Sequence, residues 1–219
     1  ILKIDDFGIW FQASERDSIF YRPFNTKVPV KSYPVAGTTE FFAKGDYAAA
    51  LNGRTLSLLN RRGLVMQINE TYSGCHVEDY YESTHHYILN CSDNALHFVS
   101  GIDGLETYTI SQFDAVRKVL LVGSDVFLLS GNSLFSYRPK AGPNPRWKAT
   151  FSNAEEILSF NGNIVVLEAS GRITLIDRET GLARNAIRSD ASSIYPLALG
   201  TLGLFSNEGD LIVVDTLLH

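Results

Sequence analysis

Long hydrophobic runs and runs of positive charge are both missing from this sequence of 219 residues. Every apolar stretch is broken by Gly, Asn or Asp within about ten residues, well short of the roughly 18 that span a bilayer as a helix. The longest basic run is Arg61-Arg62, and the net charge is −5. Because binding to nucleic-acid phosphates needs clustered Lys and Arg, the sequence predicts no nucleic-acid partner. The short apolar stretches predict no membrane-spanning segment.

Cysteine is also scarce, since Cys75 and Cys91 are the two in the chain. Two cysteines are too few for a disulfide framework, and their spacing excludes a CxxC pair. They can form one disulfide if the strands that hold them are neighbours, or they can be two reduced thiols. The sequence leaves both alternatives open.

Helical periodicity is absent too, because apolar residues alternate instead of recurring at three and four positions. The clearest unit runs from Asn163 to Gly181. It reads as a β-branched strand, a Ser170-Gly171 turn, a second alternating strand and a Thr180-Gly181 turn. Alternation between Gly-containing turns is typical of β-hairpins.

This hairpin pattern recurs along the whole chain at a period of about 38 residues. In each copy one apolar residue follows the turn that corresponds to Ser170-Gly171. Successive residues at this position are 37, 40, 38, 39 and 38 residues apart. The aligned residues are Ile19, Leu56, Leu96, Leu134, Ile173 and Leu211. Neither a β-sandwich nor a parallel β-helix gives a repeat of this length.

Each period has room for four short strands, which in the fifth copy are expected at 154–160, 164–169, 172–177 and 182–187. One such unit cannot bury both of its faces, so the copies must stack. We therefore predict an all-β fold, a β-propeller of about six short four-stranded blades, as a single domain over residues 1–219. The predicted blades are residues 1–35, 36–72, 73–112, 113–151, 152–190 and 191–219.

The sixth repeat ends where its third strand would finish. Its blade is therefore expected to have three strands or to be completed by residues outside this chain. The apolar runs Ile164–Leu167 and Leu211–Val214 are both expected to be middle strands covered on both faces by neighbouring blades.

The segment from Ile164 to Gly181 resembles the repeat of PQQ-like propellers, the class that includes the BamB-type outer-membrane assembly lipoproteins. The shared features are the small-Gly turn at Ser170-Gly171, the strand ending Ile176-Asp177 and the Thr180-Gly181 turn. Trp147 fits a Trp that often follows in that repeat. The resemblance implies the fold and a lean towards an extracytoplasmic location. It carries no function over, because those relatives have eight blades and longer chains.

The third repeat collects most of the residues with metal-binding chemistry. Four of the five histidines (His76, His85, His86 and His97) lie there with both cysteines. Zn²⁺ needs three or four converging ligands. Since His85 and His86 are expected on an exposed loop with Glu82, a strand length from His76, we predict no metal site and no cofactor.

Two segments are the candidate partner-binding surface because aromatic, imidazole or guanidinium groups are expected on loops there. The candidate residues are Tyr80, Tyr81, His85, His86, Arg146 and Trp147. Pro143 and Pro145 stiffen the loop before Trp147, which lowers the entropy lost on binding.

Catalytic patterns are missing, since the chain has no GxSxG, no P-loop and no GxGxxG after a strand. No polar position is expected to recur from repeat to repeat. The sequence thus favours a non-enzymatic scaffold for a protein partner, within an envelope or trafficking assembly. The alternative is a small propeller enzyme or a carbohydrate- or ligand-binding protein with its site at the axial pocket.

Overall fold

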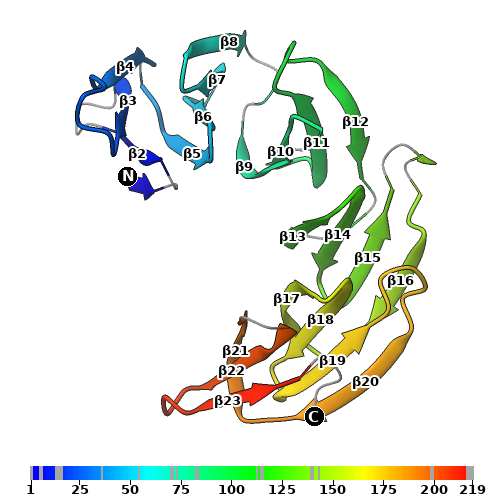
Figure 1. The fold of residues 1–219 in the computed structure, drawn as a ribbon. Coiled ribbons are helices and arrows are strands. Elements are labelled where there is room, and N and C mark those ends of the chain that lie inside the picture. The colour runs from blue at the N-terminus through cyan, green and yellow to red at the C-terminus, as the bar shows by residue number, and fades with distance from the viewer. Residues whose placement is uncertain are drawn as a thin grey trace. The chain divides into compact units, whose positions relative to one another are not determined.

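A computed structural model describes residues 2–4, 7–12, 17–35, 37–53, 55–69, 72, 74–81, 84–111, 113, 116–138, 141–142, 144–197 and 200–215. These residues form 23 β-strands in six antiparallel sheets, and the strands of each sheet follow one another along the chain (Figure 1). No helix in this described part is long and apolar enough to cross a membrane. The prediction of an all-β chain is confirmed.

The chain divides into two compact units, Ile1–Gln112 and Phe113–His219. Unit 1 contains three sheets of four strands each. The first sheet has β1 (Leu2–Ile4), β2 (Gly8–Gln12), β3 (Ser18–Pro23) and β4 (Lys31–Pro34). The second has β5 (Glu40–Lys44), β6 (Tyr47–Leu51), β7 (Thr55–Asn60) and β8 (Gly63–Asn69). The third has β9 (Cys75–Tyr81), β10 (His86–Cys91), β11 (Ala95–Ser100) and β12 (Glu106–Ile110).

Unit 2 contains two four-stranded sheets and one three-stranded sheet. The fourth sheet has β13 (Val116–Val122), β14 (Asp125–Ser130), β15 (Ser133–Tyr137) and β16 (Trp147–Thr150). The fifth has β17 (Ala154–Phe160), β18 (Asn163–Glu168), β19 (Arg172–Ile176) and β20 (Ala183–Arg188). The sixth has β21 (Ala191–Pro196), β22 (Leu202–Ser206) and β23 (Leu211–Val214).

The strands of the fifth sheet lie within one residue of the bounds expected from its alternation and turns. Gly171 ends the β18–β19 hairpin with a φ of +73°, and a Cβ there would collide with the carbonyl oxygen of Ser189. Only glycine meets both conditions without strain. Turn residues of this kind fix where each strand ends, which is why the sequence predicts the strand bounds so well.

Within each unit, consecutive sheets pack face to face and bury apolar clusters between them. Phe127, Leu129 and Leu134 of the fourth sheet pack against Ile157 and Val166 of the fifth. The first strands of neighbouring sheets also lie side by side, as β5 does with β9, β13 with β17 and β17 with β21. The faces that one sheet cannot cover by itself are thus covered by the next sheet.

Five of the six aligned apolar residues are fully buried. Ile19, Leu56, Leu96, Leu134 and Ile173 are each 0% exposed. Leu211, the sixth, is 49% exposed, and its neighbours Ile212 and Val213 are equally open. The expectation that 211–214 is covered on both faces is wrong for unit 2 by itself, because no further sheet among the described residues of that unit follows the sixth and covers Leu211 and Val213. Ile164–Leu167 is buried as predicted.

Candidate functional site

Tyr80, one of the predicted partner-binding residues, lies inside unit 1. Its side chain is 2% exposed, and its hydroxyl is 2.9 Å from Nδ1 of His85. The ring lies 4.4 Å from that of Tyr47 and 4.6 Å from that of Tyr87. Because strand alternation turns it towards the second sheet, Tyr80 is a packing residue and forms no part of an exposed surface in this structure.

His85, His86 and Tyr81 are half-buried. His86 is the first residue of β10, and its ring lies 6.1 Å from that of Tyr108. The expectation of an exposed loop at His86 is therefore wrong, since the strand begins earlier than the repeat alignment indicates. Glu82 lies outside the described residues. Binding of a partner by this segment stays a prediction.

The cysteines of the third sheet form a disulfide, which decides between the two alternatives left open by the sequence. Cys75 of β9 lies directly opposite Cys91 of β10. The condition that their strands be neighbours is met.

Trp147 and Arg146, the other predicted residues, lie between the fourth and fifth sheets. The indole of Trp147 is half-buried, and its Nε1–H donates a hydrogen bond to the carbonyl of Arg178 at 3.0 Å. A Cβ on Gly181 would lie 2.6 Å from the indole ring. The Thr180-Gly181 turn therefore needs glycine both for its φ of +74° and for the tryptophan seated on it.

Arg146 belongs to a cluster of three guanidinium groups and two carboxylates. The carboxylate of Asp125 is buried and accepts two hydrogen bonds from Arg138, at 2.8 and 3.2 Å. Arg146 lies 3.4 Å from Asp125 and 2.5 Å from Glu179. Arg178 lies 3.8 Å from Asp125. The cluster carries one net positive charge at the ends of β15 and β19.

These contacts shift the ionisation of the exposed members in the direction expected for ion pairs. The hydrogen bond from Arg146 holds the pKa of Glu179 below its usual range. The hydrogen bond to Asp125 raises the pKa of Arg138. Both shifts favour the charged form of the group concerned.

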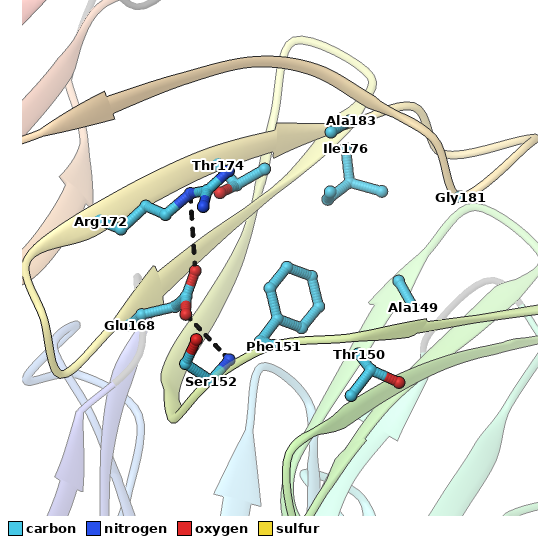
Figure 2. A pocket seen from close by; sticks show the side chains of 10 residues that line it. All are labelled: Ala149, Thr150, Phe151, Ser152, Glu168, Arg172, Thr174, Ile176, Gly181 and Ala183. Atoms are coloured by element: carbon cyan, nitrogen blue, oxygen red, sulfur yellow. Dashed lines mark hydrogen bonds and ion pairs between the residues drawn. The ribbon is translucent and has the colours of Figure 1, made fainter.

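Gly181 also lines a pocket of about 380 Å³, which Figure 2 shows. Apolar atoms of Phe151, Ile176, Ala149 and Ala183 line one part of it, and polar side chains line the rest. The complete lining is Ala149, Thr150, Phe151, Ser152, Glu168, Arg172, Thr174, Ile176, Gly181 and Ala183. The walls come from β16 with the residues after it and from the fifth sheet.

Two buried polar groups of the pocket have hydrogen-bonding capacity left. Glu168, 4% exposed, accepts the backbone N–H of Ser152 at 2.9 Å through Oε2. Its Oε1 has Arg172 as an ion-pair partner at 3.8 Å, too long for a hydrogen bond. The hydroxyl of Thr174, 3% exposed, has no hydrogen-bond partner among the described residues. Unsatisfied groups of this kind favour a ligand or water that can bond to them.

We call the pocket and the arginine cluster together the inter-sheet site. Glu168 and Thr174 were not predicted, because both lie in strands that read as core. The available signal was chemical: each is a polar residue in an otherwise apolar strand.

A polar position also recurs in the repeat, contrary to expectation. Glu40 accepts the backbone N–H of Val77, and Glu156 that of Ile194, so equivalent glutamates join neighbouring first strands in both units.

A scan against protein-family models finds no match, and a comparison of the sequence with curated proteins finds none either. Solved structures do match. BamB from Moraxella catarrhalis is 11% identical, with a TM-score of 0.66 over 99% of this chain and 76% of that chain. The C-terminal WD40 domain of Sif2 is 13% identical, with a TM-score of 0.71 over 97% of this chain and 67% of that chain.

A third structure, BBS1N in complex with ARL6DN, is 13% identical, with a TM-score of 0.63 over 94% of this chain and 74% of that chain. At these identities the likeness shows the fold alone. The chain thus has the β-propeller repeat fold, in agreement with the resemblance to PQQ-like propellers.

Proposed function

We propose that this chain is a non-enzymatic β-propeller module of six short blades that binds a protein partner through the inter-sheet site. Propellers of this fold act as rigid supports for loops and strand ends. One similar structure, BBS1N, was solved in complex with another protein, ARL6DN. That complex supports an interaction role for this chain without indicating its partner.

The pocket beside Gly181 carries the proposal. Protein interfaces concentrate binding energy in an apolar pocket that receives a few anchoring side chains, surrounded by a polar rim. The pocket has this form, with Phe151 and Ile176 as apolar wall and the exposed residues Thr150 and Arg172 as polar rim. A volume of about 380 Å³ is enough for one or two side chains of a partner.

The buried polar groups indicate what the anchoring side chain must offer. Oε1 of Glu168 and the hydroxyl of Thr174 can each accept a hydrogen bond from a donor on the partner. A ligand that satisfies both removes the cost of leaving them buried without a hydrogen bond, about 1–3 kcal/mol for each group. A partner side chain with an apolar stem and a polar tip that donates hydrogen bonds fits this pocket best.

The groups present favour binding over catalysis. The guanidinium groups of Arg138, Arg146 and Arg178 offer hydrogen-bond donors and no acceptor, which suits binding better than general-base chemistry. Glu168 already accepts a backbone hydrogen bond through Oε2. An extracytoplasmic envelope or trafficking assembly remains the proposed setting, supported by the disulfide, because such bonds persist in oxidising compartments.

The proposal is tested by filling the pocket without disturbing the core. Ala183 is exposed on β20 and lines the pocket, so Ala183→Arg places a long side chain in it. Asn207→Arg, in the exposed β22–β23 turn, makes the same change of charge elsewhere. Both variants and the parent chain carry a photo-crosslinking amino acid at Thr150, and crosslinked proteins from the native source are quantified by mass spectrometry.

We expect one partner to crosslink to the parent chain and to Asn207→Arg, and about tenfold less to Ala183→Arg, as loss of a central anchor predicts. Equal crosslinking to all three baits would reject the inter-sheet site as the binding surface.

A second candidate is a carbohydrate ligand, because Phe151 offers an aromatic face beside the hydrogen-bond acceptors of Glu168 and Thr174. Titration of the parent chain with a panel of monosaccharides, followed by NMR, tests it. Shifts confined to residues of the pocket and lost in Ala183→Arg would favour this candidate over a protein partner.

A further inference from the structure

Three metal-binding side chains of different kinds converge in the β10–β11 hairpin of unit 1. One ligand atom each from Cys91, Asp93 and His97 lies within 4.8 Å of the other two. Cys91 ends β10, Asp93 is in the turn and His97 is on β11. We propose that reduction of the Cys75–Cys91 disulfide turns this hairpin into a Zn²⁺ site with Cys75, Cys91, Asp93 and His97 as ligands.

The disulfide supplies two of the four ligands. A dithiol reductant transfers two electrons and two protons to the S–S bond, becomes a disulfide itself, and leaves two thiols on β9 and β10. Zn²⁺ then displaces both thiol protons and binds two thiolates. Because Cys75 lies directly opposite Cys91 in the sheet, strand pairing keeps the two residues neighbours after reduction.

The separation of the other two ligands already suits a tetrahedral ion. Nε2 of His97 lies 3.1 Å from Oδ2 of Asp93. Ligands at about 2.1 Å from a tetrahedral zinc are about 3.4 Å apart. The other oxygen of Asp93, Oδ1, accepts the backbone N–H of Ala95 at 3.0 Å, which holds the carboxylate in place with Oδ2 towards His97.

A second carboxylate orients the imidazole as it does in zinc proteins. Nδ1 of His97 lies 2.7 Å from Oε2 of Glu106, and Thr109 donates a hydrogen bond to the other oxygen of Glu106. Nδ1 of His97 faces Glu106 and Nε2 faces Asp93, so Nε2 is the ring nitrogen placed to bind a metal shared with Asp93. Metal-bound histidines in proteins almost always donate their other ring N–H to a carboxylate, a backbone carbonyl or a water, and the carboxylate is one of these common partners.

His76 and His85 of the third sheet have other partners. Nε2 of His76 lies 2.7 Å from Glu78, and Nδ1 of His85 faces the hydroxyl of Tyr80. His76 is therefore a matched control: it is on the same sheet and has a carboxylate partner, but lies outside the cluster. The proposed site gives the third sheet a crosslink in both redox states, a disulfide when oxidised and a metal when reduced.

Cobalt titration of the full chain tests the proposal, because Co²⁺ reports both tetrahedral geometry and thiolate ligands by absorption. The reduced chain is expected to bind one Co²⁺ with tetrahedral d–d bands and thiolate charge-transfer bands, and Zn²⁺ is expected to displace it. The disulfide form is expected to bind at least about 100-fold more weakly, since its sulfur atoms cannot ligate as thiolates.

Variants of the reduced chain assign the ligands. His97→Gln is expected to lose at least about 100-fold in affinity, Glu106→Gln about 10–100-fold, and His76→Gln nothing. Circular dichroism shows whether each variant is folded. Cys75→Ser should lose one thiolate's share of the charge-transfer intensity, and unchanged intensity would remove Cys75 from the site. A reduced chain without stoichiometric Co²⁺, or a His97→Gln variant that binds as tightly as the parent, would overturn the proposal.

Discussion

The contact between Gly181 and Trp147 shows how a single residue position links two sheets. The turn has a φ of +74°, and the indole lies where a Cβ would project. Gly181→Ala therefore combines backbone strain with overpacking, and we expect it to lower the free energy of unfolding by about 2–5 kcal/mol. Urea denaturation followed by Trp fluorescence measures this loss.

Gly162→Ala separates the two causes. Gly162 has a φ of +75° but nothing within 4 Å of the position of a Cβ. We expect it to lose only the backbone contribution, about 1–2 kcal/mol. Equal losses in the two variants would mean that Trp147 moves aside freely and does not depend on the glycine.

Asp177 gives a prediction about pH. Its carboxylate accepts hydrogen bonds from the backbone N–H groups of Glu179 and Thr180 and pairs with Arg184. The contact with Arg184, followed by those with Thr180, lowers the pKa of Asp177 to about 2. The unfolded value is about 3.9, so the unfolded chain binds more protons between these values and the native state gains stability as pH rises through them.

We therefore expect Asp177→Asn to be less stable than the parent by about 1 kcal/mol at pH 7, since solvent screens this turn. The difference should shrink as pH falls from about 5 to about 2. Urea titrations at several pH values measure it. A difference that stays constant with pH would show that the amide loses only hydrogen bonds, independent of charge.

At the scale of strands, Leu134 and Leu211 occupy the same position of the repeat but differ in burial. Leu134 of β15 is 0% exposed, and Leu211 of β23 is 49% exposed. We expect Leu134→Ala to cost about 2–5 kcal/mol and Leu211→Ala about 1 kcal/mol or less. Urea denaturation of both variants checks this. Similar costs would mean that β23 is covered in solution.

The two strands also show the limit of prediction from sequence at this scale. Both are apolar and both follow a turn, so alternation and turn residues predict them equally well. Burial depends instead on whether another sheet packs on the strand, which is a long-range property. The same holds for Tyr80, which was expected on an exposed surface and packs between two sheets.

The proposed inter-sheet site includes two residues that the sequence also singles out. Arg146 and Trp147 were identified because Pro residues and an irregular loop set that segment apart from the repeat. Glu168 and Thr174 were missed, because their strands show the alternation expected of core and the pocket depends on residues from two sheets. Residues about 20 positions apart along the chain come into contact in the pocket only after the two sheets pack.

At the scale of the whole molecule, the disulfide should stabilise one unit and not the other. The bond closes a loop with a sequence separation of 16 residues in unit 1. Closing such a loop stabilises by about 3 kcal/mol. In a metal-free buffer we expect reduction to increase hydrogen exchange in β9–β12 and to leave β17–β20 of unit 2 unchanged, as measured by mass spectrometry.

Zn²⁺ extends this experiment. If the reduced hairpin binds the metal, protection of β9–β12 should return when Zn²⁺ is added, but not in His97→Gln. Loss of protection in unit 2 on reduction would contradict the confinement of the effect to unit 1.

The sequence by itself determined the repeat, the strand bounds of the fifth copy and the β-propeller repeat fold, because alternation and turn chemistry are local and recur at a constant period. Tertiary structure decided which apolar strands are covered, that Cys75 and Cys91 are joined, and that Glu168 and Thr174 share a pocket. It also decided that His97 meets Cys91 and Asp93. These facts depend on strand register and on packing between sheets, which set distances between residues that the order of the chain does not specify.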